Sequence, residues 1–207
     1  LSVDDGIGAS TSIEIPLVHS GAANGHAAAN IVCTASVESV TAGGSAASAW
    51  LSEQLDFPSC ELKSVVGSDP DHSPTRSFAN DAPYLAVSAS SAAVLAASIN
   101  MSGPQLVERF RPNLVISGLP PFVEDFADVV EIDGVVFDVV GKCTRCEMIC
   151  IDQRTGEKDP AAILALRDAR RGQQLTFGIY LRQRFIEEDK EMVISTGKKI
   201  IMWKEQD

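Results

Sequence analysis

Hydrophobic and polar residues alternate in short runs along most of this chain of 207 residues, a pattern typical of half-buried β-strands. In the first part of the chain, such runs predict strands at 12–17, 30–40 and 60–66. The rest is denser in them, and we expect strands at 83–87, 114–116, 129–132, 135–140, 148–151, 175–181 and 200–203. Turn residues separate most of these runs, which favours a β-rich fold.

Helical signals are fewer. Ser45 precedes an apolar run and is expected to cap a helix, and a second helix is expected at 90–99. A third is expected between Asp159, a capping residue, and Gly172, which ends it. Many short strands with few helices predict a mainly β fold with α elements (α+β), in which helices decorate a β-barrel core.

The turn between two of the expected strands is the strongest local signal. Asp133 and Gly134 separate the apolar runs 129–132 and 135–140. A tight two-residue hairpin needs positive φ at both turn positions, and an Asp-Gly pair supplies it. We therefore predict a β-hairpin here.

The charge and the cysteine content of the chain limit the partners and the cellular location that we expect for it. The formal net charge of -11 makes nucleic acids and anionic membranes poor partners. No run approaches the roughly 20 apolar residues that cross a bilayer, so we expect a soluble protein. The odd number of cysteines favours a reducing, cytoplasmic location over a disulfide framework. The chain begins with Leu1 rather than Met, so we expect a piece of a longer protein. The cysteines are Cys33, Cys60, Cys143, Cys146 and Cys150.

Two short segments carry candidate chemistry. In Cys143-Thr144-Arg145-Cys146, a guanidinium beside a thiol favours the thiolate, which binds soft metals and carries sulfur. The alternatives are packed core thiols or half of a zinc site. The second segment runs from Arg109 to Asn113 and combines two arginines with an amide, groups that bind phosphate and the polar edge of a heterocycle. A surface salt bridge is its alternative.

Other polar groups have simpler interpretations. Cys150 lies in an apolar run and is expected to pack in the core. Glu124 and Asp125 could form a general acid/base pair, but neighbouring carboxylates point in different directions, so a solvated turn is favoured. Asp152 precedes a Thr-Gly turn and is expected to bond its own backbone.

Taken together, these segments resemble a known family. The motifs are the run from Phe110 to Gly118, the pair Glu124-Asp125, the Cys-x-Arg-Cys segment, the run from Ile151 to Gly156, and Phe177-Gly178. They are similar to the MOSC domain, which is named for the C-termini of molybdenum cofactor sulfurases. The run from Cys146 to Gln153 resembles the eukaryotic sulfurases more than the amidoxime-reducing enzymes that have the same fold.

The resemblance extends upstream and implies two domains. Trp50 to Glu53 and Ser77 to Asp81 resemble the second half of the β-barrel that precedes MOSC in these proteins. We expect residues 1–75 to be part of that smaller barrel and residues 76–207 to be a MOSC-type β-barrel. The family's Lys-Ser anchor, and an arginine after it, lie further upstream and have no counterpart here, so we expect reduced cofactor affinity.

The resemblance also implies roles for individual residues. Cys146 matches the cysteine that ligates molybdenum in the reductase relatives, which makes it the expected catalytic residue and metal ligand. The expected cofactor-binding residues are Arg111, Asn113, Thr144, Arg145, Cys146, Asn80, Asp81 and Tyr180. For Asn80 and Asp81 the match is incomplete, because relatives carry hydroxyl residues in this loop. Tyr180 either lines the pocket or packs in the core.

The function implied is that of a sulfurtransferase acting as part of a longer protein. An upstream cysteine desulfurase domain, dependent on pyridoxal phosphate and absent here, takes sulfur from L-cysteine as a persulfide. This chain holds the molybdenum cofactor (molybdopterin) while sulfur is placed on molybdenum, and the product activates xanthine dehydrogenase or aldehyde oxidase. The alternatives are a molybdenum oxidoreductase that reduces N-hydroxylated substrates and a non-catalytic binding domain.

Overall fold

The chain divides into two compact units, Leu1–Asn80 and Asp81–Asp207. The structure is a computed structural model, and it describes residues 2–4, 10–12, 28–32, 35–41, 44–65, 82–184 and 193–205. The expected domain boundary, between residues 75 and 76, lies outside these residues. No helix in the described ranges is long and apolar enough to cross a membrane.

The first unit contains two small antiparallel sheets and a helix. Strands β1 (Ser2–Asp4) and β2 (Ser10–Ser12) form one sheet, and β3 (Ala28–Val32), β4 (Ala35–Thr41) and β5 (Lys63–Val65) form the other. Helix α1 (Gly44–Gln54) is the predicted helix, but it begins at Gly44, so Ser45 lies within it and is not its cap. The run 30–40 thus forms two paired strands rather than one. Most of the strand expected at 12–17 lies outside the described residues.

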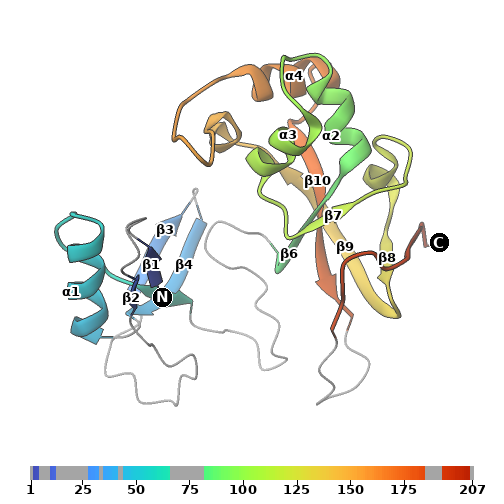
Figure 1. The fold of residues 1–207 in the computed structure, drawn as a ribbon. Helices are drawn as coiled ribbons and strands as arrows, with labels where there is room; N and C mark the ends of the chain where they lie inside the picture. Colours follow the sequence, from blue (N-terminus) through green and yellow to red (C-terminus); the bar gives the residue numbers. More distant parts are fainter. Residues whose placement is uncertain are drawn as a thin grey trace. The chain divides into compact units, whose positions relative to one another are not determined.

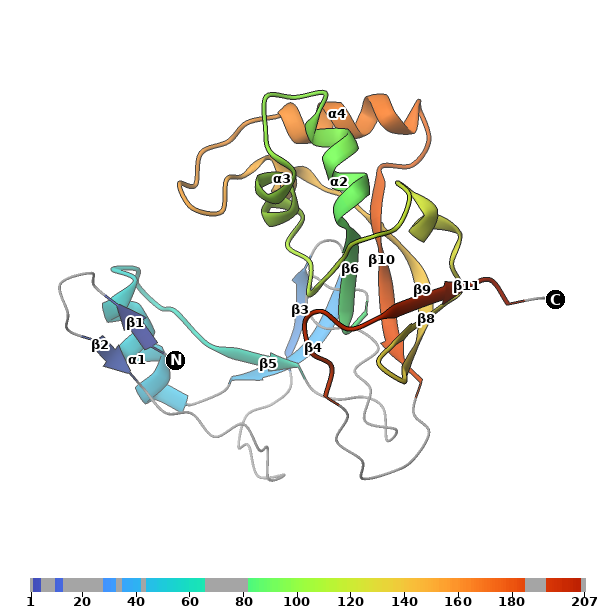
Figure 2. The ribbon, with the colours of Figure 1, turned by 45° about the vertical axis from the view of Figure 1, so that its right-hand side comes forward.

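The second unit is built on a six-stranded sheet that curls into a half-barrel (Figures 1 and 2), in the order β11-β8-β9-β10-β6-β7. Neighbouring strands are antiparallel except for β6 and β7, which are parallel. The α+β, barrel-type prediction is confirmed. The strands are β6 (Tyr84–Ser88), β7 (Leu114–Ile116), β8 (Val129–Ile132), β9 (Val135–Thr144), β10 (Thr176–Gln183) and β11 (Ile200–Trp203).

Three helices gather at one end of this sheet, shown at the top in Figure 1. They are α2 (Ala89–Ala96), α3 (Gly103–Phe110) and α4 (Ala161–Arg170). Helix α3 was not predicted from the sequence. It is only 8 residues long, and its start is marked by a capping box in which the side chains of Ser102 and Gln105 bond each other's backbone. That signal was available in the sequence.

The predicted hairpin is confirmed. Strands β8 and β9 pair from Val129 with Asp138 to Ile132 with Val135. The turn residues Asp133 and Gly134 have φ of 53° and 82°. Strand β9 continues past the expected end to Thr144, which carries the chain from the hairpin to the Cys-x-Arg-Cys segment.

The strand expected at 148–151 is wrong. Glu147–Cys150 form a single 3-10 turn, η2, in which the neighbours Ile149 and Cys150 are both buried. Alternation would have put them on opposite faces. A short apolar run does not distinguish a strand from one helical turn, because both bury several residues in a row.

A glycine in β10 changes which face of the sheet its neighbours occupy. Phe177 packs with the helices, in a cluster that includes Leu106 and Leu166. Ile179, two residues later, packs in the cluster on the opposite face. The pairing register shifts between Thr176 and Ile179, and Gly178 has φ 78°. This β-bulge therefore turns Phe177 toward the helical end, where the candidate site lies.

Candidate functional site

The candidate residues come from two segments of the chain, and the side chain of Arg145 forms a hydrogen bond between them. Arg111 and Asn113 follow α3, whereas Thr144, Arg145 and Cys146 follow β9. Nη1 of Arg145 donates to the carbonyl oxygen of Phe110 at 3.0 Å. The bond links the residue before Arg111 to the residue before Cys146. The fold therefore brings the two predicted segments together.

Arg145 is held mostly by backbone groups. Its amide donates to the carbonyl of Leu175 at 2.7 Å, and its Nε donates to that of Phe177 at 2.9 Å. The guanidinium lies over the Phe110 ring, 4.9 Å from the centroid. Burial lowers the pKa of Arg145, while the nearby Cys143, Tyr180 and Cys146 act to raise it. Nη2 is buried and has no hydrogen-bond partner among the described residues.

Of the three neighbouring cysteines Cys143, Cys146 and Cys150, only Cys146 is exposed. It lies at the start of η2, whereas Cys143 at the end of β9 and Cys150 at the end of η2 are buried. Within the described ranges, no group of three or more potential metal ligands is found. Thr144, also exposed, accepts a hydrogen bond from Nε2 of Gln174 at 3.0 Å. A thiol at position 146 is accessible to a ligand.

Arg111 and Asn113 have different roles in the backbone. Arg111 ends α3 in the left-handed region, with φ 53°, and its exposed side chain bonds no described residue. Asn113 is anchored to β6, because its amide donates to the carbonyl of Leu85 at 2.9 Å and its Oδ1 accepts from the Leu85 amide at 2.8 Å. Its Nδ2 makes no hydrogen bond to the described chain. Arg111 thus offers a full guanidinium, and Asn113 offers one amide group.

The remaining predicted residues are less exposed or not described. Tyr180 is 8% exposed in β10, and the Cys143 thiol donates to its hydroxyl at 3.1 Å. Tyr180 therefore packs in the core beside the site. Asn80 and Asp81 lie outside the described residues. Their predicted contact with the cofactor, like the other residue roles, stays a prediction.

Arg109 is a structural residue rather than half of a surface salt bridge. It is 7% exposed, and its Nη1 donates to the carbonyl oxygens of Cys150 at 3.0 Å and Asp159 at 3.4 Å. Its Nη2 lies 3.6 Å from Oδ2 of Asp152. It therefore ties α3 to the segment after η2. Oδ1 of Asp152 accepts from the amides of Arg154 and Thr155, as predicted.

Glu124 and Asp125 do not form the solvated turn that we expected. Glu124 is 1% exposed, and its Oε1 accepts a hydrogen bond from Ser91 at 2.6 Å. The Asp125 side chain is 4% exposed and pairs with Arg170 at 2.5 Å. Both residues lie in the 3-10 turn η1 (Val123–Phe126), which packs against β10. Their burial could not be predicted from local sequence, because Ser91 and Arg170 are far away along the chain.

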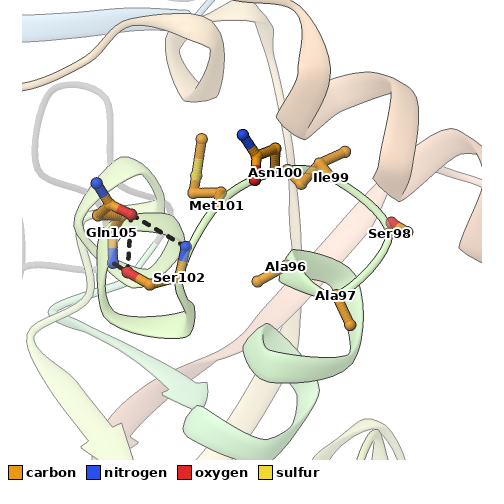
Figure 3. A pocket seen from close by; sticks show the side chains of 8 residues that line it. All are labelled: Ala96, Ala97, Ser98, Ile99, Asn100, Met101, Ser102 and Gln105. Atoms are coloured by element: carbon orange, nitrogen blue, oxygen red, sulfur yellow. Dashed lines mark hydrogen bonds between the residues drawn. The ribbon is translucent and has the colours of Figure 1, made fainter.

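Two surface hollows lie near these elements. One, of about 690 Å³, is lined by residues 113–117 of β7 and its flanks, by Ile132, and by residues 194–198 and Ile200. The other, of about 640 Å³, lies at the connection from α2 to α3 and is lined by residues 96–102 and Gln105 (Figure 3). Asn113 is one of the residues that line the first. Cys146 lines neither of them.

Comparison with known proteins identifies the family. Residues 73–201 match the MOSC domain. The chain belongs to the MOSC domain family. The resemblance of the Cys-x-Arg-Cys and Phe-Arg-Pro-Asn segments to MOSC domains is thereby confirmed.

Proteins named molybdenum cofactor sulfurase are similar to this MOSC chain. The one from Caenorhabditis briggsae is 44% identical over 159 residues, which cover 77% of this chain and 22% of the relative. The Caenorhabditis elegans protein is 43% identical over the same coverage. The Drosophila grimshawi protein is 32% identical over 95% of this chain and 25% of its own length. The chain spans a quarter or less of the length of these relatives.

The donor groups at the joined segments fit a molybdenum cofactor. Such a group combines a soft metal with an anionic phosphate and a polar heterocycle. Cys146 provides an accessible sulfur, and Arg111 provides an unpaired guanidinium within the described part of the protein. The Nη2 of Arg145, buried and without a partner among the described residues, is a further unused hydrogen-bond donor on the segment before Cys146.

Proposed function

We propose that this MOSC chain is the part of a molybdenum cofactor sulfurase that holds the molybdenum cofactor while it receives sulfur. The observation that carries the proposal is the 3.0 Å bond from Arg145 to the Phe110 carbonyl, which joins the segment of Cys146 to the segment of Arg111. An accessible thiol and an unpaired guanidinium then lie on neighbouring parts of one unit.

In this proposal each residue has a distinct task. Cys146 would hold the metal end of the cofactor through its sulfur, since a soft sulfur is a suitable ligand for molybdenum. Arg111 binds the phosphate through its planar fork of N–H groups. Asn113 reads the polar edge of the pterin with Nδ2, while its Oδ1 stays bonded to Leu85. When bound, the cofactor supplies the metal centre that accepts sulfur.

Arg145 and Thr144 hold the Cys146 segment in place through hydrogen bonds to neighbouring parts of the chain. Arg145 uses its backbone amide, Nε and Nη1 on three carbonyl oxygens, which leaves Nη2 for the cofactor. Thr144 is bonded to Gln174 and flanks the same turn. Tyr180 holds the Cys143 thiol in the core.

The activity of the whole protein is part of the proposal. The chain acts as a sulfurtransferase together with an upstream, pyridoxal-phosphate-dependent desulfurase domain that supplies sulfur from L-cysteine. The support is that the similar proteins are named molybdenum cofactor sulfurase and are more than three times as long as the matched region. Xanthine dehydrogenase and aldehyde oxidase are the proposed acceptors.

Cofactor loading tests the proposal. The chain is produced in a host that makes the molybdenum cofactor, and bound molybdenum and cyanide-releasable sulfur are measured for wild type, Cys146→Ser and Arg111→Ala. We expect both variants to retain roughly a tenth or less of the wild-type molybdenum. Cys60→Ser and Arg154→Ala are matched controls, because Cys60 lies in the first unit and Arg154 pairs with Glu108.

Three results would count against the proposal. Molybdenum content that is unchanged in both site variants would remove the assigned residues. Wild-type protein that takes up no cofactor, although it is folded, would favour a non-catalytic binding domain. Reduction of N-hydroxylated substrates by the loaded chain with an electron donor would instead favour the oxidoreductase.

A further inference from the structure

Two arginines donate hydrogen bonds to three consecutive carbonyl oxygens at the start of β10. Arg145 binds those of Leu175 and Phe177, through its amide at 2.7 Å and its Nε at 2.9 Å. Arg170, at the end of α4, donates from Nε to the carbonyl of Thr176 at 2.8 Å. The conformation of this short segment therefore depends on both side chains. The hydrogen bonds of Arg145 and Arg170 thus meet in one three-residue segment.

Arg170 is itself fixed by a buried carboxylate. Its Nη1 lies 2.5 Å from Oδ2 of Asp125, and the two side chains are 12% and 4% exposed. Lys142 of β9 approaches the same Oδ2 at 3.8 Å. A buried ion pair of this kind costs desolvation, so its value is more often orientation than stability.

A column of aromatic rings makes a second connection between the two arginines. Arg170 lies over the Phe122 ring, 5.4 Å from its centroid, and the Phe122 and Phe177 rings form a T-shaped pair with centroids 6.4 Å apart. Phe177 stacks on Phe110 at 4.1 Å, and Arg145 lies over the other end of the column. Dense packing transmits displacements, so the two guanidinium groups are mechanically linked by the backbone and by the rings.

We propose that Asp125 and Arg170 are positioning residues for the cofactor site, acting through the Leu175–Phe177 segment and the aromatic column to orient Arg145. This inference rests on the proposed function, because one of its two tests measures the affinity of the chain for the cofactor. Neither residue touches the proposed cofactor contacts. Their role is to keep the Arg145 guanidinium, and with it the Cys146 and Arg111 segments, in one arrangement.

A double-mutant cycle tests the connection. Arg170→Lys keeps the charge opposite Asp125 but cannot also reach Thr176, and Arg145→Lys removes the planar fork. The probe is molybdenum cofactor released from a purified molybdoenzyme. We expect Arg170→Lys to weaken its affinity about tenfold in wild type, and to have less than about a twofold effect in the Arg145→Lys background. Equal effects in both backgrounds, or none in wild type, overturn the proposal.

A measurement without cofactor separates this inference from the proposed function. The Arg145 Nε–H signal, identified by its loss in Arg145→Lys, is followed by nuclear magnetic resonance. We expect its hydrogen exchange to speed up about tenfold in Arg170→Lys and in Asp125→Asn, because its bond to Phe177 is loosened. Arg184→Lys, which alters an exposed pair beyond the far end of β10, is the control and leaves the signal unchanged.

The two experiments distinguish failure of the positioning role from failure of the proposed function. An Arg145 signal that is unaffected by Arg170→Lys and Asp125→Asn overturns the positioning role, whatever the cofactor data show. Wild-type protein that binds no cofactor defeats the proposed function, while the exchange rates still decide whether Arg170 and Asp125 orient Arg145. A melting temperature lowered equally by Arg170→Lys and Arg184→Lys, with no change in the Arg145 signal, also overturns the proposal by assigning Arg170 a stabilising role only.

Discussion

Cys146 and Cys150 lie four residues apart and have opposite surroundings. Cys146 is exposed at the start of η2, whereas Cys150 is 2% exposed at its end. Cys143, at the end of β9, is 4% exposed. A thiol must be accessible to react or to bind a metal, so the fold singles out one of the three.

Selective alkylation follows from this difference. In the native protein, we expect iodoacetamide to modify Cys146 at least about tenfold faster than Cys143 or Cys150, since a buried thiol reacts only after local opening. Peptide mass spectrometry over time measures the rates, and modification in guanidinium chloride is the control in which all three react. Equal native rates for Cys146 and Cys150 would contradict the assignment.

Gly178 is a second residue whose identity the fold requires. It has φ 78°, and a Cβ there would lie 2.6 Å from the carbonyl oxygen of Ala86 and 2.9 Å from Cγ2 of Val87. It would also lie 3.4 Å from Nη2 of Arg145. The close approach of β10 to β6, and the space for Arg145, both depend on the missing side chain.

Substitution of this glycine should be costly. We expect Gly178→Ala to lower the free energy of unfolding by about 3 kcal/mol, because alanine disfavours the left-handed backbone conformation and its Cβ would clash with β6. Gly156→Ala is a matched control, because Gly156 has φ 75° with nothing within 4 Å of its Cβ position. It should cost about 1 kcal/mol. Equal losses in urea titrations would contradict the close approach.

At the scale of elements, η1 is tied to α2 by a buried hydrogen-bond chain. The Phe122 amide donates to Oγ of Ser91 at 2.8 Å, and that hydroxyl donates to Oε1 of Glu124 at 2.6 Å. Burial raises the pKa of Glu124 above its ordinary value of 4.5, and the bond from Ser91 opposes this only in part. Burial therefore disfavours the charged form of this carboxyl group relative to that of an exposed glutamate.

The pH dependence of stability tests this. Because the folded-state pKa is raised, the contribution of Glu124 is fully present below pH 4.5 and is lost as pH rises through the folded value. We expect Glu124→Gln, which stays neutral, to unfold at a higher temperature than wild type at pH 8, with the difference shrinking toward pH 4.5. The exposed Glu157→Gln is the control. A difference that does not vary with pH would refute this prediction.

The elements also show where sequence patterns succeed. Strands β7, β8 and β11 lie where the apolar runs predicted them, because each run is short and bounded by polar or turn residues. The run at 148–151 forms η2 instead, because four apolar residues fit one buried turn as well as a strand. Helix α3 is only 8 residues long, and its sequence signal is the capping box of Ser102 and Gln105 rather than a long apolar pattern.

At the scale of the whole molecule, the second unit has the features of a protein that folds alone. The residues from 81 to 207 contain both buried hydrophobic clusters, one under the helices and one on the other face of the sheet. Each cluster is made only of residues within this unit. A domain with its own core does not need a neighbour to fold.

Expression of residues 81–207 tests this independence. We expect a single cooperative unfolding transition by circular dichroism, because the six-stranded sheet and its three helices are all retained. Amide signals of β8, β9 and β10 should keep their positions relative to the full chain. A shorter piece that begins at Ala89 and lacks β6 is the control, and it should not fold. An unfolded 81–207 would show that the first unit is required.

The sequence alone determined the features that depend on neighbours along the chain. The Asp133-Gly134 hairpin, the turn around Asp152 and the three strands above follow from local backbone preferences. The Cys-x-Arg-Cys and Phe-Arg-Pro-Asn motifs predicted the family, and the match to the MOSC domain confirmed it.

Only the tertiary structure decided the surroundings of the charged and thiol groups. It buried Glu124, Asp125 and Arg109, exposed Cys146, and used Arg145 to join α3 to β10. These outcomes depend on partners 30 or more residues away, such as Ser91 for Glu124 and Phe110 for Arg145. Desolvation and hydrogen bonding act between such partners only after the chain has folded, so local patterns could not predict them.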